Sequence, residues 1–559
     1  MSNEKKGLFV TADGKNMFFV FALVSSLFFL WALCNGMIDV MDKHFQDFLG
    51  LSKADSACIQ FAHYVGYFLM AIPAGILAKK LGYKGGIIAG LSMVALGCLW
   101  FIPATHIAQF WAFLLGVCFI AMGLTFLETV ANPYTTVLGH PEFAATRINL
   151  AQSFNGVGWI LGPILGGVFF YNSAGVEAAH KSLWIPYAGI AAGVTVLILI
   201  FAMTKLPDLV GDDSLHVDAD AVNPKQAYED DRKVNRLLAY IFMVLNVSVL
   251  AGTFAFVFKF LAVNIFDVFH PGTNAVKQAF GEKVISIASQ VAPWMHVSAE
   301  SVTKDNAAWL VSGAITAIGT LVAALVLIPA AVRIHNKSIW SHPHFASSTL
   351  TQFLYVAAQA GIFSFFINYV VAEIPPVGPR FSDSWFLGGE AGVTARDGTF
   401  FVSEQGATKL LAVGFFLFMI GRFSGSAILR KTSAHKTLGV YALVNTLLMV
   451  VVMLKIGWIS MVAVFLSFFF MSIMFPTIFA LGIYGLGSKA KMASSFIVMS
   501  ITGGAMMPQV MGKVGDYYNM STAFVVPLVC FAVISLVSFA WPLLSGASSL
   551  SGVDASWGH

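Results

Sequence analysis

Apolar blocks of about twenty residues recur along the whole chain, and this feature constrains the fold more than any other. A helix of that length crosses the hydrocarbon core of a bilayer, whereas a transmembrane β-barrel shows short segments of alternating polarity. Of the 559 residues, 58% are hydrophobic and 11% are charged, while about a quarter of a typical soluble domain is charged. We therefore predict an all-α polytopic membrane protein embedded in a lipid bilayer.

The number of spans follows from counting these blocks. We expect about fourteen transmembrane helices by the criterion of roughly twenty apolar residues each. The first block is too long for a signal peptide and lacks a small-residue cleavage motif, so we expect it to be a span. The predicted spans are residues 17–40, 57–82, 85–104, 107–138, 146–171, 183–207, 236–266, 307–334, 346–373, 405–431, 436–455, 457–485, 491–512 and 522–545.

The basic residues predict the orientation of the chain. One set of loops carries most of the Lys and Arg residues, including Lys79, Lys80, Arg333 and Lys337, and the opposite loops carry few. Loops rich in Lys and Arg stay in the cytoplasm. With an even number of spans, we expect both termini in the cytoplasm. Since the basic residues act as topology signals in this interpretation, we expect no nucleic-acid partner.

The two ends of the chain resemble each other. FLETVANPYTTVLG (126–139) and AQSFNGVGWILGP (151–163) in the first part correspond to SIMFPTIFALGIYGLG (472–487) and SSFIVMSITGGAMMP (494–508) in the second. Internal repeats of six spans are typical of transporters built from two pseudo-symmetric bundles. The predicted division is an N-terminal six-helix bundle at 1–207, a cytoplasmic linker at 208–235, an inserted transmembrane hairpin at 236–344, a C-terminal six-helix bundle at 345–545 and a tail at 546–559.

Two spans match neither repeat. They are residues 236–266 and 307–334, and they stand between the halves in the sequence. Because the halves must still close on each other around a central path, we expect this inserted hairpin at the periphery. Lys259 interrupts its apolar character. We interpret Lys259 as a lysine that snorkels to the membrane interface, with a functional role as the alternative.

Asp39 and Glu128 are the two carboxylates placed deepest in the apolar spans of the first half. A charged side chain at the bilayer centre costs about 3 kcal/mol on insertion scales, so such residues should face a cavity or a partner. Trp31, Asn35 and Asp39 are spaced four apart and therefore share one helix face. Asn132 follows Glu128 at the same spacing and shares its face.

The fifth span adds the amides of Gln152 and Asn155 to this set. Carboxylates and amides exchange hydrogen bonds with sugar hydroxyls, and aromatic rings stack on the C–H face of a pyranose. A carboxylate in a medium of low dielectric constant also holds a proton more readily than it does in water. We therefore expect Asp39 and Glu128 to bind substrate or a proton, with a structural hydrogen bond inside the bundle as the alternative for each.

The second half has a polar set of its own. Gln352, Tyr355 and Gln359 recur at three to four residues, so they share one helix face. Asn368 follows near the outer end of the same span, and we expect all four residues to bind substrate. Arg422, in FMIGRFSG, is expected deep in the second half. Its possible roles are gating, pairing with an acid, substrate contact or capping of a cytoplasmic cluster.

His63 lies in the second span on a stripe with Gln60, Tyr64 and Tyr67. Histidine titrates near neutral pH, so His63 is a candidate proton shuttle or charge partner; a hydrogen-bonded histidine of the bundle is the other interpretation. The five cysteines show neither a CxxC motif nor Cys/His ligand spacing. We therefore expect no metal site, disulfide or cofactor beyond a coupling ion.

Several long motifs occur in order along the chain: FFLWALCNGMID, YFLMAIPAGILAKKLGYKGGIIAGL, FLETVANPYTTVLG, INLAQSFNGVG, IGRFSG, MSIMFPTIFALGI and SSFIVMSITGGAMMP. Together they resemble the fucose–galactose–glucose:proton symporter family of the major facilitator superfamily. The likeness covers 17–207 and 345–545. It implies a major facilitator fold, here with an inserted two-helix hairpin.

The resemblance also implies roles for particular residues. Asp39 and Glu128 match acids that line the central cavity, with Glu128 as the proton carrier and Asp39 coupling sugar to proton. Asn35, Gln152 and Asn155 match cavity amides, and Arg422 matches an arginine of the second half. Gly36, His63, Asn368 and Phe475 depart from the family pattern, which leaves the identity of the sugar open.

We therefore expect a proton-coupled symporter that imports a hexose or related monosaccharide, of the fucose, galactose, glucose and N-acetylglucosamine class, by alternating access. We expect it to work as a monomer in a bacterial inner membrane. Sodium coupling and uniport are alternatives within transport, and a non-transporting sugar sensor is another. An enzyme would need a catalytic set near an interface; the HPHF cluster at 342–345, which we interpret as a solvated turn, does not supply one.

Overall fold

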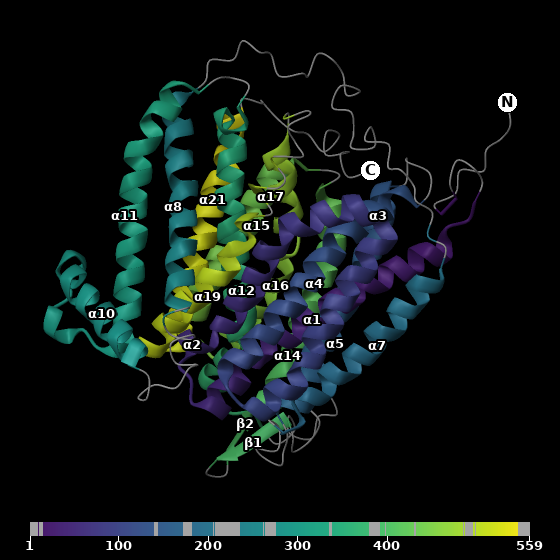
Figure 1. Cartoon of the computed structure of the whole chain (residues 1–559), viewed down its shortest axis with the longest axis horizontal. Helices are drawn as coiled ribbons and strands as arrows, with labels where there is room; N and C mark the ends of the chain where they lie inside the picture. The colour runs from purple at the N-terminus through teal and green to yellow at the C-terminus, as the bar shows by residue number, and fades with distance from the viewer. Residues whose placement is uncertain are drawn as a thin grey trace.

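The computed structural model describes residues 9–10, 15–138, 144–171, 181–204, 206, 235–260, 262, 275–334, 338–378, 392–396, 399–429, 432–484, 486, 493, 496–497 and 499–545. Almost all of the described chain is helical (Figure 1). The N-terminal half contains α1 (Phe18–Leu49), α2 (Lys53–Ser56), α3 (Cys58–Ile107), α4 (Phe110–Val137), α5 (Ala144–Phe170) and α7 (Trp184–Met203). The inserted region contains α8 (Arg236–Phe260), α10 (Ala275–Val291) and α11 (Lys304–Val332), with short 3₁₀ turns between α10 and α11.

The C-terminal half begins with α12 (Pro343–Glu373) and a two-stranded antiparallel ribbon, β1 (Val393–Arg396) and β2 (Thr399–Val402). Its remaining helices are α14 (Glu404–Leu429), α15 (Ala434–Met453), α16 (Trp458–Met471), α17 (Met474–Ile483), α19 (Gly503–Tyr517), α20 (Met520–Ala523) and α21 (Val525–Ser545). In the ribbon, Val393 pairs with Val402 and Arg396 pairs with Thr399. The residues predicted to form the cytoplasmic linker and the tail lie largely or wholly outside the described part.

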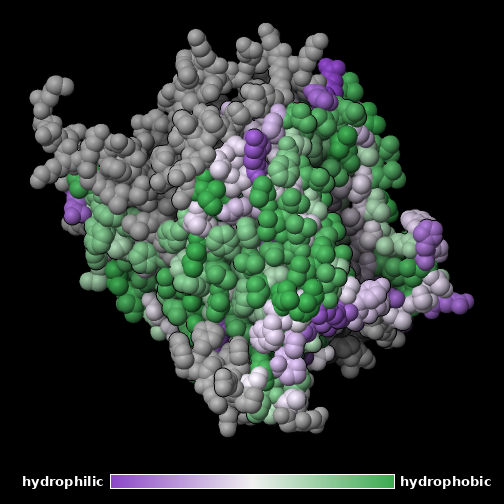
Figure 2. Space-filling model, turned by 180° about the vertical axis from the view of Figure 1, so that it is seen from behind, coloured by the Kyte–Doolittle hydropathy of each residue, from purple (hydrophilic) through white to green (hydrophobic). Residues whose placement is uncertain are grey.

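Within the described residues, 11 helices are long and apolar enough to cross a membrane. This agrees with the predicted class and is consistent with fourteen spans. The spans expected at 57–82 and 85–104 are the two helical segments of α3, which are separated by a non-helical turn at Gly82, where φ is 67°. The span expected at 457–485 is divided between α16 and α17. Figure 2 shows a broad hydrophobic surface with hydrophilic residues concentrated toward its edges, as expected for a protein that faces lipid.

Glycines hold the first and fifth helices of each half together, as the sequence repeat suggests. On α5, Gly158 and Gly162 lie directly against the α1 backbone around Phe29 and Gly36, where a Cβ would collide. On the other half, Gly503 at the start of α19 lies against the backbone of Phe353 on α12. Small residues allow helices to approach closely where no hydrophobic drive from water is available. The repeated motifs therefore build equivalent helix pairs in both halves.

The inserted helices α8 and α11 stand at the edge of the molecule, as expected (Figure 1). Most of their surface faces outward; Leu321 of α11 is 62% exposed and Val326 is 66% exposed. The interpretation of Lys259 as a snorkelling lysine is wrong. Its side chain is 1% exposed, its Nζ donates to Oε1 of Gln509 at 2.8 Å, and it lies 4.0 Å from the ring centroid of Trp309. An acceptor and an aromatic face compensate for the lost hydration, so the lysine stays inside.

We call the end of the bundle that carries α2, the β ribbon and the last turn of α12 the β side. On this side the N- and C-terminal halves are bonded to each other. The Lys53 backbone N–H donates to Asp516 Oδ1 at 3.0 Å, and the Nζ of Lys53 lies 3.4 Å from the same oxygen. The amide of Asn368 donates to Gln46. Among the described residues we find no corresponding hydrogen bond or ion pair between the halves on the opposite side, so the structure is closed on the β side.

Two pseudo-equivalent seams join the halves. The α5–α14 seam is tight and largely apolar. A Cβ added at Gly167 would collide with the Thr408 side chain, and the Trp159 and Phe415 ring centroids are 4.7 Å apart. The α19–α3 seam includes α2 and contains polar contacts, among them the thiol of Cys58, which lies 3.9 Å from Gln509 Oε1.

Candidate functional site

Polar side chains from both halves gather at one depth in the bundle. At 1.5 Å per residue, Trp31 of α1, Glu128 of α4, Tyr355 of α12 and Arg422 of α14 each lie about 27 Å along their helices from the β-side end. Four helices, two from each half, therefore present an indole, a carboxylate, a phenol and a guanidinium in the same layer. Trp31, Glu128 and Arg422 are only partly buried.

Asp39 lies two turns closer to the β side than Trp31. Its side chain is 6% exposed, and Oδ1 accepts a hydrogen bond from Gln60 Nε2 of α3 at 2.8 Å. Within the described residues, Oδ2 has no hydrogen-bond partner. Tyr64, one turn after Gln60, lies within electrostatic range of Asp39. The predicted acid of α1 therefore faces the polar stripe of α3 and not the lipid.

Glu128 joins the same stripe one turn further along α3. Tyr67 lies within electrostatic range of Glu128 and beside the side chains of Asn35 and Trp31. The ring centroids of Tyr64 and Tyr67 are 6.5 Å apart. The polar side chains Gln60, Tyr64 and Tyr67 of α3 thus lie between Asp39 and Glu128, and the Tyr67 hydroxyl makes no hydrogen bond to a described group. The sequence placed Tyr64 and Tyr67 on one stripe but gave no indication that the stripe lies between the two acids.

The C-terminal half supplies partners at the same depth. Tyr355 is fully buried, donates its hydroxyl to the Met471 carbonyl at 3.1 Å, and lies within electrostatic range of both Tyr64 and Arg422. The Arg422 guanidinium lies 5.2 Å from the ring centroid of Phe418 and has no ion pair with a carboxylate in the described part of the chain. Gln352 is buried with neither amide atom hydrogen-bonded to a described group.

The remaining predicted residues are placed as follows. Asn155 of α5 is 6% exposed, and Asn35 donates to the Trp31 carbonyl of its own helix at 2.7 Å. Gln359 is half-buried one turn after Tyr355. The ring of His63 packs against those of Tyr64 and Tyr67, at 5.2 and 5.0 Å between centroids. The side chains of Asn132 and Gln152 lie outside the described part of the structure.

Asn368 does not join the central group. It lies about 20 Å beyond Tyr355 on α12 and bonds to Gln46 across the closed β side. Its predicted partners in substrate binding are therefore at a different level in this conformation. In the sequence, Asn368 was grouped with the other polar residues because it lies on the same predicted span, near its outer end, and membership of a span does not report depth.

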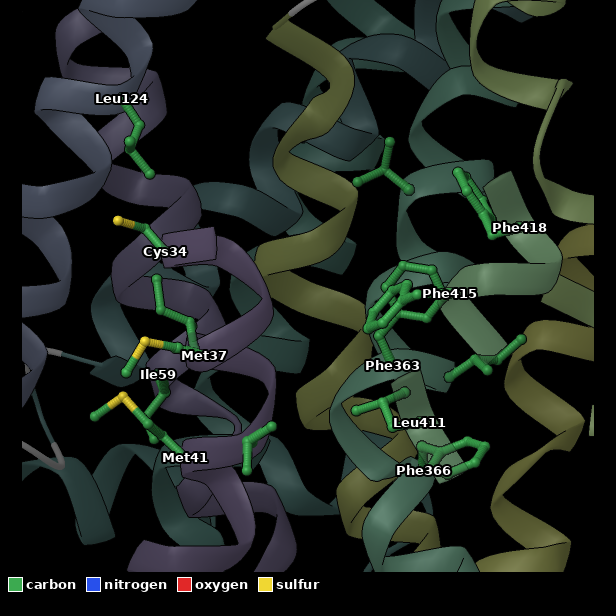
Figure 3. Close-up of a cluster of buried hydrophobic side chains, with 14 of the residues drawn as sticks. Cys34, Met37, Met41, Ile59, Leu124, Phe363, Phe366, Leu411, Phe415 and Phe418 are labelled. Atoms are coloured by element: carbon green, nitrogen blue, oxygen red, sulfur yellow. The ribbon is translucent and has the colours of Figure 1, made fainter. Parts of the chain in front are cut away.

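An aromatic layer separates the central group from the β side. Phe363 of α12 and Phe415 of α14 lie 4.8 Å apart between centroids, and Trp159 of α5 packs against both, at 5.8 and 4.7 Å. Figure 3 shows Phe363, Phe366, Phe415 and Phe418 gathered on the C-terminal half, opposite Cys34, Met37 and Met41 of α1. Phe363 lies about 15 Å along α12 from the β-side end, so the layer stands between that end and the central polar groups.

Sequence reasoning missed Asp42. This residue is fully buried one turn after Asp39, and neither of its carboxylate oxygens has a hydrogen-bond partner among the described residues. The predicted span ended at residue 40, which placed Asp42 in a loop, whereas α1 continues to Leu49. The signal that could have found it was the spacing of three between Asp39 and Asp42, which puts them on adjacent turns of one helix.

The HPHF cluster is not the solvated turn that we expected. His344 is fully buried at the start of α12, and its Nε2 lies 2.9 Å from the Tyr484 carbonyl. The helix packs His344 against Trp541, 6.2 Å between centroids, which shields it from solvent. No group of three or more potential metal-ligating side chains occurs in the described residues.

Two six-helix halves that are hydrogen-bonded to each other on the β side, with acids and amides gathered in one layer between them, define a secondary membrane transporter. The chain belongs to the Major Facilitator Superfamily, whose family model matches residues 18–496. It is a transporter and not an enzyme.

Relatives of established name cover nearly the whole chain. The sequence is 32% identical to the L-fucose-proton symporter of Escherichia coli (strain K12) over 92% of this chain and 91% of that protein. It is 27% identical to the glucose/galactose transporter of Brucella abortus biovar 1 over 94% of both.

Solved structures agree with the fold. The crystal structure of a fucose:proton symporter variant from E. coli is 29% identical and gives a TM-score of 0.52, covering 94% of this chain and 99% of that one. A POT family transporter crystallised with 5-aminolevulinic acid is 11% identical and gives a TM-score of 0.57, covering 94% and 96%. The second likeness concerns the fold alone.

Proposed function

We propose that this chain is a proton-coupled symporter that moves a hexose or related monosaccharide across a bacterial inner membrane by alternating access. The names of the relatives support a sugar as substrate and H⁺ as the coupling ion. The observation that carries the proposal is the placement of the polar side chains Tyr64 and Tyr67 between Asp39 and Glu128 of the central layer.

The central layer has the chemistry of a sugar site. Glu128, Asn35 and Asn155 offer acceptors and donors for hydroxyl groups, and the half-buried indole of Trp31 offers an apolar face for a pyranose ring. From the other half, Gln352 contributes a buried amide with unused hydrogen-bonding capacity among the described groups. A sugar held between these residues contacts both halves, so its binding favours the conformation in which they approach each other.

The proton belongs to the same layer. Glu128 is half-buried and lies within electrostatic range of Tyr67, which is beside the proposed sugar contacts Trp31 and Asn35, so its charge and the sugar's hydroxyls affect each other. With both termini in the cytoplasm, as the basic loops predict, the β side faces outward and the conformation is closed to the outside. A single chain holds every residue of the site, so we propose that the monomer is sufficient.

Reconstituted protein in liposomes tests the proposal. In Glu128→Gln, sugar accumulation driven by an inward proton gradient should fall to the level of empty liposomes, while exchange of labelled for unlabelled sugar persists because exchange needs no net proton movement. Glu300→Gln, on an exposed turn, is the matched control and should accumulate sugar normally. Normal accumulation by Glu128→Gln would overturn the assignment of Glu128.

The same liposomes distinguish the rival couplings. Replacement of sodium by choline at fixed pH should leave uptake unchanged, whereas a collapse of uptake would indicate a sodium symporter. Uptake that ignores both gradients would indicate a uniporter. Absence of exchange for fucose, galactose, glucose and N-acetylglucosamine, with binding retained, would indicate a sensor.

A further inference from the structure

Asp42 is a buried acid that the proposed proton path does not use. It lies on α1 about 10 Å from the β-side end, at the place where α1 approaches α12 of the other half. Its side chain is completely buried, and both oxygens lack a hydrogen-bond partner among the described residues. Ser364 of α12 lies beside it but outside hydrogen-bonding geometry.

Few charged or titratable groups face Asp42. On its own helix Asp39 lies one turn away and within electrostatic range. Lys43 pairs with Asp47, and His44 Nδ1 lies 2.9 Å from the Phe170 carbonyl. From the end of α5, Tyr171 lies within electrostatic range and donates its hydroxyl to the Val40 carbonyl at 2.7 Å.

α12 presents only the neutral hydroxyl of Ser364 at this point. Among the described groups, therefore, no cation compensates a charge on Asp42. An ionised carboxylate enclosed without hydrogen bonds or a cation is strongly disfavoured, whereas a protonated one is tolerated far better. The closed β side thus accommodates Asp42 as a neutral acid.

The enclosure depends on the two halves being together. Ser364 belongs to the C-terminal half, so separation of α1 from α12 on the β side uncovers Asp42 to water, where the ionised form is stable. We infer that Asp42 is a second proton-binding residue, whose protonation accompanies closure of the β side and whose ionisation accompanies its opening. The inference rests on the proposed proton-coupled function, which it deepens by naming a proton site at the closing face.

Linkage sets the size of the effect. If closure takes up one proton at Asp42, the ratio of closed to open molecules changes by up to about tenfold per pH unit in the range where the open form is ionised. Acidification favours the closed β side and alkalinisation favours the open one.

The test measures the separation of the halves on the β side. Spin labels are placed at Gln109→Cys, between α3 and α4, and Ala372→Cys, at the end of α12; both positions are exposed. Four of the five native cysteines are buried and Cys118 is partly buried, and all five are replaced in the background. Distance distributions are recorded from pH 5 to pH 9 in full-length protein in lipid nanodiscs.

In the wild-type background the short-distance population should grow as the pH falls. In Asp42→Asn, the short distance should dominate at every pH, with less than a twofold change in the ratio. Asp42→Glu retains a titratable group and should retain the pH dependence, and Asp47→Asn, the exposed acid on the same helix, should behave like the wild type. A single symmetric size-exclusion peak and an unchanged thermal unfolding temperature show that each variant is folded.

A pH dependence in Asp42→Asn equal to that of the wild type overturns the inference, as does a shift of this variant toward the open state. These outcomes are separate from failure of the proposed function. If uptake by the wild type ignores the proton gradient while Asp42→Asn abolishes the pH dependence of closure, the proposed function fails and the proton site at Asp42 stands.

Discussion

The two seams between the halves are equivalent in topology and different in chemistry. At the α5–α14 seam, aromatic rings and close-packed glycines form a largely apolar contact. At the α19–α3 seam, Gln509 is the meeting point of three segments, because its Oε1 accepts from Lys259 of α8 at 2.8 Å and lies 3.9 Å from the Cys58 thiol. Phe260 of α8 also packs on Phe61 of α3, with centroids 4.9 Å apart.

The inserted helix α8 therefore touches both halves at one seam and has no counterpart at the other among the described residues. The pseudo-symmetry of the helices therefore does not extend to the side-chain contacts at the two seams between the halves. We expect the apolar seam to depend on shape, and the polar seam to depend on the attachment of the inserted hairpin.

The largest effect is expected from disturbing shape at the apolar seam. Gly167→Val places a branched side chain where Thr408 leaves no room. Overpacking of this kind costs about 1–3 kcal/mol, so the ratio of closed to open molecules should fall by about 5- to 150-fold. Sugar exchange in liposomes measures the loss. Gly189→Val is the matched control, because nothing lies within 4 Å of a Cβ added on α7; equal activity of the two variants would contradict the importance of this contact.

A smaller effect is expected at the polar seam from Lys259→Met. Methionine keeps most of the volume and removes the charge-assisted hydrogen bond to Gln509, which is worth about 1.5 kcal/mol. Hydrogen exchange of the α8 amides should accelerate by about tenfold, while α5 and α14 remain unchanged. Lys283→Met, on the exposed side of α10, should leave the α8 amides unaffected. Unchanged exchange in Lys259→Met would show that the hairpin is held by its apolar contacts alone.

The smallest effect is expected from the partly exposed ion pair of the same seam. Lys53→Ala removes its side-chain contact with Asp516, and such pairs contribute about 0.2–1 kcal/mol. The closed population should fall less than about fivefold, and the difference from the wild type should shrink at high salt because the charges are screened. The spin-label pair at Gln109→Cys and Ala372→Cys measures this closed population. A larger effect that persists in salt would make Lys53 a principal latch.

The sequence predicted the elements well because span length and glycine repeats are local properties. It placed Asp39 and Glu128 on inward faces for the same reason. It failed where the outcome depends on a neighbour from a distant part of the chain. Lys259 remains buried only because Gln509 and Trp309 surround it. The sequence near residue 259 does not predict either partner.

Depth was the second obstacle. Asp42 was assigned to a loop because polar residues begin there, yet α1 continues through them, supported by the Lys43–Asp47 pair and the contact of His44 with the Phe170 carbonyl. Asn368 was grouped with Tyr355 because both residues belong to one predicted span, and membership of a span does not give the level of a residue in the membrane. A span count locates the ends of a helix too loosely to decide either case.

The position of α8 and α11 has a consequence for how the bilayer acts on the molecule. The hairpin stands over one seam, whereas the other presents Val168, 50% exposed, and Phe416, 46% exposed, to the acyl chains. Lateral pressure and membrane thickness therefore act directly on the contact between the halves only at the α5–α14 seam. A change of lipid composition therefore affects the α5–α14 seam through direct contact with lipid. At the α19–α3 seam the inserted hairpin separates the halves from the lipid.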